Sequence, residues 1–416
     1  MHKLSIVERL FSITNEEYYK VIRFCGFPFK IDRRNRFHKK YDNLPLENKI
    51  VISNFFGGAY GCNPKYVAEE ILKENLPLDI VWLVRNKEQY NENSPFPSKI
   101  RLVDYESEDA IKEFATARFW LNNQRLLYHL KKGLVKRDDQ MYIQTWHGSL
   151  GIKKLDADVE SFNTPEKQAW VRMAKYDSSM MDYMLSNSDF EDKILPPALW
   201  FNNKMIKFGH PRNDVFFYSE EKRNKTKEKV YSKLNIDSDK KMILYVPSFR
   251  DNNSAQGYDI DYKGLVESLK EKFGGDWAVV IRLHPRAKSF SETIIPSADY
   301  IFDGTTYPDI QELLVSADIA MTDYSSCIFD FVLSRKPAFI YASDAKDFDS
   351  TRGFYYPLTG TPFPVAENNE QLMNNIKNFD NETYLKNVEE FLDGKGCIED
   401  GCASERVVEL IKEKMV

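Results

Sequence analysis

The sequence predicts an α/β protein built from two Rossmann-like domains that face each other across a central cleft. The chain has 416 residues, and single domains usually hold roughly 100 to 200, so two hydrophobic cores are expected. Apolar residues make up 42% and charged residues 29%, the balance of a folded globular protein. From about residue 49 onward, short β-branched or aromatic runs alternate with turns and amphipathic stretches, which predicts parallel sheets covered by helices.

The strands follow from the apolar runs in this alternation. In the first half they are expected at 49–56, 79–84, 100–105, 118–123, 141–146, 183–188 and 205–209. In the second half they are expected at 241–249, 277–283, 300–304, 319–323 and 337–343. Between the halves, residues 219–240 are rich in Lys and Glu and too polar for a core, so they predict a solvated helix and linker at the domain boundary. The expected domains are 41–225 and 226–400.

The first forty residues, 1–40, differ from this alternation. They interleave aromatic residues such as Phe24, Phe27 and Phe29 with a basic run that includes Arg33 and Arg36. Such a mixture suits the interface of an anionic membrane, at about 1 kcal/mol per basic residue near the surface. A surface hairpin that packs on the first domain explains the segment equally well.

The last residues, 401–416, predict a terminal helix. Ser404 is the expected N-cap. Val407, Val408 and Ile411 have the spacing of its buried side.

Composition excludes several classes of function. The net charge of −5 argues against nucleic acid as a partner, because phosphate binding normally leaves a basic signature. The five cysteines form no CxxC pair and no zinc-ligand spacing, which favours a reduced, cytoplasmic protein without a metal site. No apolar run approaches the roughly 18 residues of a membrane span, and the N-terminus does not have the pattern of a signal peptide. Membrane contact is therefore expected to be peripheral.

Candidate site residues follow strands, because ligands of open parallel sheets bind beyond the carboxyl ends of the strands. His147 follows 141–146, where Gly148 and Gly151 allow close backbone approach, and has the position of a general base. His284 follows 277–283 and is the candidate hydrogen-bond donor or acid. Capping histidines and surface loops explain each of these positions separately.

The segment after 319–323 predicts a phosphate site. Ser325 and Ser326 stand at the start of a helix, where free backbone N–H groups, the helix dipole and two hydroxyls would bind an anion. Ordinary N-capping is the alternative. The other candidate donor-binding or phosphate-binding residues are Thr322, Asp323, Ser248, Arg212, Arg250 and Gly148. The sequence has no HExxH, GxSxG, Walker or GxGxxG motif, so hydride transfer, ATP hydrolysis and serine hydrolysis lose support.

The same residues carry a family resemblance. In order, the motifs are NPK (63–65), TWHG (145–148), SNS (186–188), G-x-P-R-N-D (209–214), PSFRD (247–251), RLHP (282–285), TDYSS (322–326) and RGFYY (352–356). Over about 49–410 the chain resembles the CDP-glycerol:poly(glycerophosphate) glycerophosphotransferases of teichoic-acid and capsule synthesis. His210 departs from the family, because that position of the G-x-P element is not usually histidine.

The resemblance implies a GT-B-like fold, with the CDP-linked donor held by the C-terminal half and the acceptor approaching from the N-terminal half. It implies essential roles for His147 and His284, and donor-phosphate binding by Ser325 and Ser326. The implied donor is CDP-glycerol or CDP-ribitol, with no further cofactor. The implied acceptor is a polymer or lipid-linked chain at the inner face of the cell membrane.

The expected reaction is transfer of a polyol phosphate to an acceptor hydroxyl with release of CMP. In this hypothesis His147 is the general base, and Ser325, Ser326, His284 and nearby arginines stabilise the developing charge. Two alternatives stay open. One is a sugar-nucleotide glycosyltransferase or epimerase on the same fold, and the other is a non-catalytic nucleotide-binding subunit of a polymer-synthesis complex.

Overall fold

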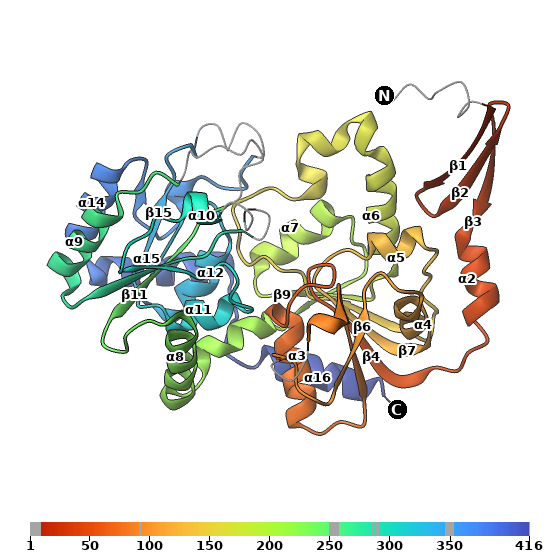
Figure 1. Ribbon diagram of the computed structural model, residues 1–416, viewed down its shortest axis with the longest axis horizontal. Helices are drawn as coiled ribbons and strands as arrows, with labels where there is room; N and C mark the ends of the chain where they lie inside the picture. Colours follow the sequence, from red (N-terminus) through yellow and green to blue (C-terminus); the bar gives the residue numbers. More distant parts are fainter. Residues whose placement is uncertain are drawn as a thin grey trace.

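The computed structural model describes residues 10–90, 94–248, 258–284, 287, 291–345 and 353–415. Two α/β lobes lie side by side, the N-terminal one drawn in orange to yellow and the C-terminal one in green to blue (Figure 1). Each lobe contains one parallel sheet. This confirms the predicted fold class of two Rossmann-like halves.

The N-terminal sheet has seven parallel strands in the order β10-β9-β8-β7-β4-β5-β6. They are β4 (Glu47–Ser53), β5 (Asp79–Val84), β6 (Ile100–Asp104), β7 (Ala117–Asn122), β8 (Met141–Gln144), β9 (Tyr183–Ser186) and β10 (Lys204–Lys207). Side chains that alternate along β4 enter different cores. Ile50 and Ile52 pack with α3 (Cys62–Lys73), and Val51 packs with helices on the opposite face. Burial on both faces explains why these strands are continuous apolar runs.

The C-terminal sheet has six strands in the order β13-β12-β11-β14-β15-β16. They are β11 (Lys241–Val246), β12 (Trp277–Ile281), β13 (Ile301–Asp303), β14 (Ile319–Thr322), β15 (Ala338–Tyr341) and β16 (Val365–Ala366). Numbered along the chain, this order is 3-2-1-4-5-6, the arrangement of a dinucleotide-binding Rossmann sheet. In both parallel sheets the strand order reverses between the first and fourth strands, which are β4 and β7 in one sheet and β11 and β14 in the other.

The helices connect the strands and cover the faces of the sheets. In the N-terminal lobe they are α3, α4 (Glu108–Thr116), α5 (Leu127–Lys131), α6 (Gln168–Met180) and α7 (Asp189–Leu199). The others are α8 (Glu220–Leu234), α9 (Tyr262–Phe273), α10 (Ser291–Ile294), α11 (Ile310–Ser316), α12 (Cys327–Phe331), α14 (Asn369–Lys377), α15 (Asn381–Lys395) and α16 (Ala403–Glu413). Among the described helices, none is long and apolar enough to span a bilayer.

Every strand predicted in the two alternating regions is present. Strand β5 has the predicted bounds, β7 has the predicted length, and the other strands are shorter by one to three residues. Polar strand-end residues such as Asn187 and Ser248 lie outside the strands. The two-residue strand β16 was not predicted, since it carries too few residues to give a pattern. The linker prediction at 219–240 is correct for a charged helix, α8, but Val230 and Tyr231 on that helix are buried.

The first described residues form a separate antiparallel sheet. Its strands are β1 (Phe11–Glu16), β2 (Tyr19–Phe24) and β3 (Phe27–Asp32), in that order, and α2 (Arg33–Tyr41) joins them to the N-terminal lobe. The sheet extends away from that lobe (Figure 1). Arg34 attaches the base of this sheet to the N-terminal lobe. Its guanidinium lies 3.9 Å from the Tyr18 ring and 5.3 Å from the Tyr176 ring of α6.

The terminal helix α16 returns to the N-terminal lobe. Val407, Val408 and Ile411 are buried, as predicted, in the same core as Ile50 and Ile52, and α16 lies beside α3 (Figure 1). The N-cap prediction at Ser404 is wrong. Cys402 holds that position, and the carboxylate of Asp214 accepts the N–H groups of Ala403 and Ser404 at 3.0 and 2.8 Å. A long-range carboxylate thus replaces the local hydroxyl.

Candidate active site

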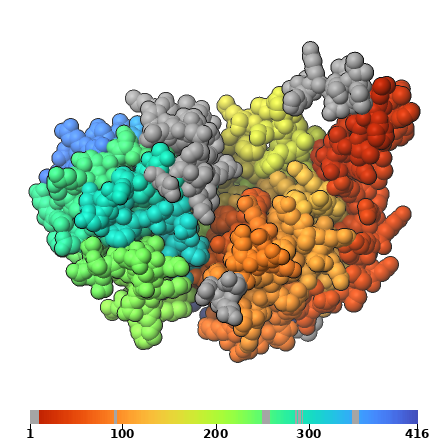
Figure 2. All heavy atoms as spheres, in the orientation of Figure 1, coloured from red at the N-terminus to blue at the C-terminus, as the bar shows by residue number. Residues whose placement is uncertain are grey.

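The candidate site lies at the points where the two sheets reverse strand order, since ligands of such sheets bind there beyond the carboxyl ends. In the N-terminal sheet these loops are 54–57 after β4 and 123–125 after β7. In the C-terminal sheet they begin at 247 after β11 and at 323 after β14. Figure 2 shows the two lobes that contribute them.

His147 lies beside the N-terminal reversal point. Its Nδ1 is 2.7 Å from the backbone oxygen of Asn123, and its Nε2 is 3.3 Å from the side-chain nitrogen of Gln124. A carbonyl oxygen only accepts, so Nδ1 carries the proton and donates it to Asn123. Nε2 then holds a lone pair toward which the Gln124 amide donates. The ring is half-buried, and this bond makes Nε2 the basic nitrogen of the neutral ring.

Aromatic side chains surround the His147 ring. The ring centroid of Trp146 is 4.5 Å from it and that of Phe55 is 5.4 Å, edge on. Phe55, Phe56 and Trp146 have φ values of 42°, 58° and 50°, in the left-handed region that costs non-glycine residues energy and is concentrated at functional sites. Asn123 holds this turn, because its Oδ1 accepts the N–H of Phe55 at 2.9 Å.

The loop after His147 reaches the C-terminal lobe. A Cβ added to Gly151 would lie 3.2 Å from the Cβ of Ser326, and one added to Gly148 would lie 3.9 Å from its Oγ. Leu150 and Ile152 are buried in the core of the C-terminal lobe. The structure therefore brings the loop that follows His147 against Ser326 of the other polar edge, and the absence of a side chain at Gly151 permits the close approach.

Ser325 and Ser326 precede α12 and are both half-buried. Among the described residues, the Ser326 side chain makes no capping hydrogen bond to this helix, so ordinary N-capping does not account for it. Thr322 and Asp323 are 1% exposed. Both carboxylate oxygens of Asp323 lie 2.9 Å from the backbone nitrogen of Ser248. Asp323 thus joins the loops after β11 and β14 and supports the serine segment.

His284 is exposed at the carboxyl end of the C-terminal sheet, three residues after β12. Its carbonyl accepts the N–H of Ala287 at 2.8 Å. It therefore lies on the same sheet edge as Ser248 and Ser326. The predicted phosphate ligand Arg250 lies outside the described residues, as do Pro285 and Arg286.

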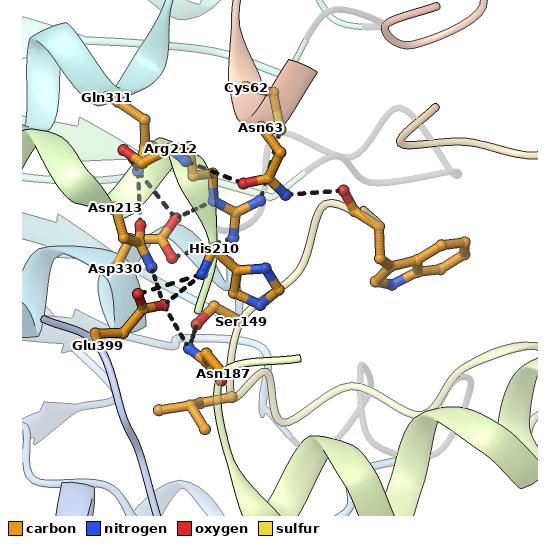
Figure 3. Close-up of polar contacts among 12 residues, drawn as sticks. Cys62, Asn63, Ser149, Asn187, His210, Arg212, Asn213, Gln311, Asp330 and Glu399 are labelled. Carbon is orange, nitrogen blue, oxygen red and sulfur yellow. Dashed lines mark hydrogen bonds and ion pairs between the residues drawn. The ribbon is translucent and has the colours of Figure 1, made fainter. Parts of the chain in front are cut away.

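Arg212 has a structural position rather than an open one (Figure 3). The side chain is 4% exposed, and its Nε lies 3.0 Å from Asp330 of α12. Its backbone N–H donates to Asn63, whose amide donates in turn to the carbonyls of Thr145 and Trp146. The guanidinium of Arg212 thus pairs with the buried Asp330 and links the G-x-P-R-N-D element to α12. That Arg212 reaches a phosphate stays a prediction.

A cluster of polar residues around Glu191 supports the loop that follows His147. Glu191 accepts the N–H of Leu150 at 3.3 Å and that of Asn187 at 2.9 Å, and it pairs with His210 at 3.0 Å. Asn187 donates to Ser149 at 2.7 Å and to Glu399 at 3.0 Å (Figure 3). His210, the departure from the family motif, therefore positions Glu191, and its backbone N–H donates to Glu399, which also accepts from Asn187.

Burial and charge change the pKa values of two residues in this cluster, Glu399 and His210. Removal from water raises the pKa of Glu399 to about 7, against the opposing effect of His210. Burial lowers the pKa of His210, but the charge and hydrogen bond of Glu191 outweigh it, so the net pKa is raised. Both groups therefore hold their protons more tightly in the folded chain.

Lys65, a buried residue of α3, joins the two lobes. The Lys65 ammonium lies 2.8 Å from Asp309 and 2.7 Å from Glu312, both in the C-terminal lobe. Burial opposes its charge, but the carboxylates raise the pKa of Lys65 above its ordinary value. The NPK motif is thus an interdomain contact.

Sequence reasoning missed the partners of His147. Asn123 and Gln124 belong to the NNQ run that ends a predicted apolar strand, so their polarity at a strand end was an available signal. Phe55 and Glu191 gave no signal, since their roles depend on residues distant in the chain. Within the described part of the chain, no cluster of three or more His, Cys, Asp or Glu side chains is placed to hold a metal ion.

Comparison with known proteins gives consistent matches. The family model for CDP-glycerol:poly(glycerophosphate) glycerophosphotransferases matches residues 37–413. A teichoic acid poly(glycerol phosphate) polymerase of Bacillus spizizenii is 30% identical over 380 residues, which cover 88% of this chain and 92% of the relative. A protein of the same description from Bacillus subtilis is 32% identical over 379 residues, but this chain spans only 49% of its length.

Solved structures give the same result. The wall teichoic acid polymerase TagF superposes with a TM-score of 0.77 at 27% identity, over 92% of this chain and 93% of that one. A histidine-to-asparagine variant of TagF soaked with CDPG superposes with a TM-score of 0.78 at 26% identity, with the same coverage. The fold is therefore GT-B-like, as expected.

Proposed function

Because this chain belongs to the CDP-glycerol:poly(glycerophosphate) glycerophosphotransferase family, we propose that it transfers glycerol phosphate from CDP-glycerol to a hydroxyl of a teichoic-acid-like acceptor and releases CMP. The named relatives act in teichoic acid synthesis, and a related structure was soaked with CDPG. The observation that carries the proposal is the bond from His147 Nδ1 to the Asn123 carbonyl, at the start of a loop whose Gly151 approaches Ser326 of the facing lobe.

In the proposed reaction His147 is the general base. Its Nε2 takes the proton of the acceptor hydroxyl as that oxygen attacks the β-phosphorus of the donor. The new P–O bond forms while the bond from that phosphorus to the bridging oxygen breaks, and the electron pair leaves on CMP. The Nδ1–H bond to Asn123 favours this role, since it directs the lone pair to Nε2 and stabilises the imidazolium that forms.

The C-terminal lobe would bind the donor phosphates. Ser325 and Ser326 offer hydroxyls and backbone N–H groups, and His284 and Arg250 complete the proposed set. Such groups stabilise the charge that develops on transferring phosphoryl oxygens, and positioning supplies most of phosphoryl-transfer catalysis. Ser248, Thr322 and Asp323 would act by holding the serine segment, and Gly148 by permitting close approach.

The acceptor in this proposal is a growing polymer or a lipid-linked chain, so the enzyme would act in the cytoplasm at the inner face of the cell membrane. The contact would be peripheral, through the segment before residue 41. The basic and aromatic composition of that segment supports this location.

The test is CMP release by the purified full chain with a soluble synthetic acceptor. We expect His147→Ala to lower kcat about 100-fold to 10,000-fold while donor binding, measured by calorimetry, is retained. His38→Ala, at a half-buried histidine of α2 outside the proposed site, is the matched control and should retain activity. CDP-ribitol and UDP-sugars are offered in parallel. Unchanged turnover by the His147 variant would remove that residue from the mechanism, and turnover of a UDP-sugar alone would replace the proposed donor.

A further inference from the structure

The β1–β3 sheet presents its apolar side to solvent. The register pairs Phe11 with Phe24 and Phe24 with Phe27, and two residues further along it pairs Ile13 with Ile22 and Ile22 with Phe29. Side chains in these rows share one face of the sheet. The exposed apolar residues of this face are Phe11, Ile13, Phe24, Phe27, Phe29 and Ile31, between 50% and 71% exposed.

The opposite face carries the polar residues and is the more buried one. Val21 on that face is 0% exposed, and Arg23 donates to Thr14 at 2.8 Å and pairs with Glu16. A sheet in a water-soluble domain normally has the reverse arrangement. A contiguous exposed apolar patch of this kind marks an interaction surface.

The most apolar end of the sheet is its outer tip. Phe24 and Phe27 flank the turn at Cys25–Gly26, and this end points away from α2 and the N-terminal lobe (Figure 1). Lys20 lies on the same face but at the base, opposite Ile31. The face therefore changes from aromatic at the tip to cationic near the lobe.

The charge around the patch selects the partner. Between residues 20 and 40, Lys or Arg stands at positions 20, 23, 30, 33, 34, 36, 39 and 40, and Asp32 is the single acidic residue, in a chain of net charge −5. Pairing with Glu16, Asp32 and Glu108 engages three of these cations. A second copy of the sheet would bring like charges together. An anionic bilayer offers apolar depth for the tip and phosphate groups for the basic base.

We propose that the apolar face of the β1–β3 sheet inserts its aromatic tip into an anionic lipid bilayer, with the basic residues of β2, β3 and α2 at headgroup level. The proposal gives the peripheral contact a defined surface, and it is independent of the transfer chemistry. Arg34 stacks on Tyr18 and Tyr176, and Arg172 pairs with Glu17. Because these contacts fix the sheet to the N-terminal lobe, the bilayer would lie beside that lobe.

The experiment is flotation of the full chain with vesicles of phosphatidylcholine alone or with 30% (about one lipid in three) phosphatidylglycerol. The test variant is Phe24→Ser/Phe27→Ser/Phe29→Ser, and the matched control is Phe217→Ser, an exposed phenylalanine elsewhere in the chain. We expect the wild type and control to float with the anionic vesicles, and the triple variant to bind at least about 10-fold more weakly. CMP release with a soluble acceptor should be unchanged in the triple variant.

Three results would overturn the proposal. They are equal flotation of the triple variant, equal binding to neutral and anionic vesicles, and a lipid-free dimer in sedimentation analysis that the triple substitution converts to a monomer. The last would assign the face to a second copy of the chain. Failure of CMP release in the wild type would instead count against the proposed reaction, so the two failures are distinguishable.

Discussion

At the scale of single residues, one backbone carbonyl determines which nitrogen of His147 is basic. The Asn123 oxygen fixes the proton on Nδ1, and Gln124 approaches Nε2. The sequence predicted the position of His147 because a histidine at a strand end is visible locally. It did not predict the pairing of Arg212, because Asp330 is more than a hundred residues away and neither side chain shows the contact in its local pattern.

Replacement of Gln124 tests whether Nε2 of His147 is the nitrogen that accepts the proton. Gln124→Glu places a carboxylate 3.3 Å from Nε2 in the wild-type geometry, which favours the imidazolium, a form that cannot accept a proton. We expect the acid limb of the kcat/KM pH profile to move up by about one pH unit. Gln124→Ala is the control and should not move the limb upward. A limb that stays in place in both variants would contradict the assigned base.

The buried Glu399 predicts a pH dependence of stability. Its folded pKa of about 7 lies above the ordinary value of 4.5, so the unfolded chain releases this proton first as the pH rises. Stability is therefore lost from about pH 4.5 to 7, by at most about 3 kcal/mol. Raised pKa values of His210 and Asp214 act in the same direction. Denaturant titrations between pH 5 and 8 should show a shallower decline for Glu399→Gln, and parallel curves would exclude Glu399 as the source.

At the scale of elements, hydrophobic runs predicted the strands of both sheets because strands buried on both faces are apolar at nearly every position. The same logic could not predict which elements contact each other. Helix α3 shows this, since the sequence marks NPK only as a motif. Tertiary structure gives Lys65 its two carboxylate partners, and Asp214 rather than Ser404 caps α16.

Removal of the α3 cation should be costly. Lys65→Met leaves the buried Asp309 without its cation and Glu312 paired with Lys229, and we expect the free energy of unfolding to fall by about 3 to 5 kcal/mol. Lys73→Met, on the same helix, breaks an exposed pair with Glu70 and should cost less than about 1 kcal/mol. Denaturant unfolding measures both. Similar losses in the two variants would show that the interdomain pair does not contribute specially.

At the scale of the whole molecule, the two lobes share the segment that carries His147. Leu150 and Ile152 enter the core of the C-terminal lobe, and the N–H of Lys154 donates to Gly353 at 3.1 Å. The sequence predicted two facing domains. It could not predict that an N-terminal loop would complete the other domain, because local patterns carry no information about which core a loop enters.

A side chain at residue 151 should separate the two lobes locally. Gly151→Val places new atoms within the 3.2 Å contact to Ser326. We expect kcat for CMP release to fall about 10-fold to 100-fold, because displacement by about 1 Å is enough to lose alignment. Gly394→Val, where the added Cβ meets open space, is the matched control. Circular dichroism and thermal unfolding check that both variants fold. Full activity of Gly151→Val would show that the approach is not required.

The return of α16 to the first lobe has a consequence for biosynthesis. The core that contains Ile50 and Ile52 is completed by Val407, Val408 and Ile411, which the ribosome adds only after both parallel sheets. The N-terminal parallel sheet therefore has part of one face uncovered until α16 has been synthesised. A nascent chain stalled before residue 403 would expose this surface to chaperones and proteases, although the C-terminal sheet itself had been synthesised in full.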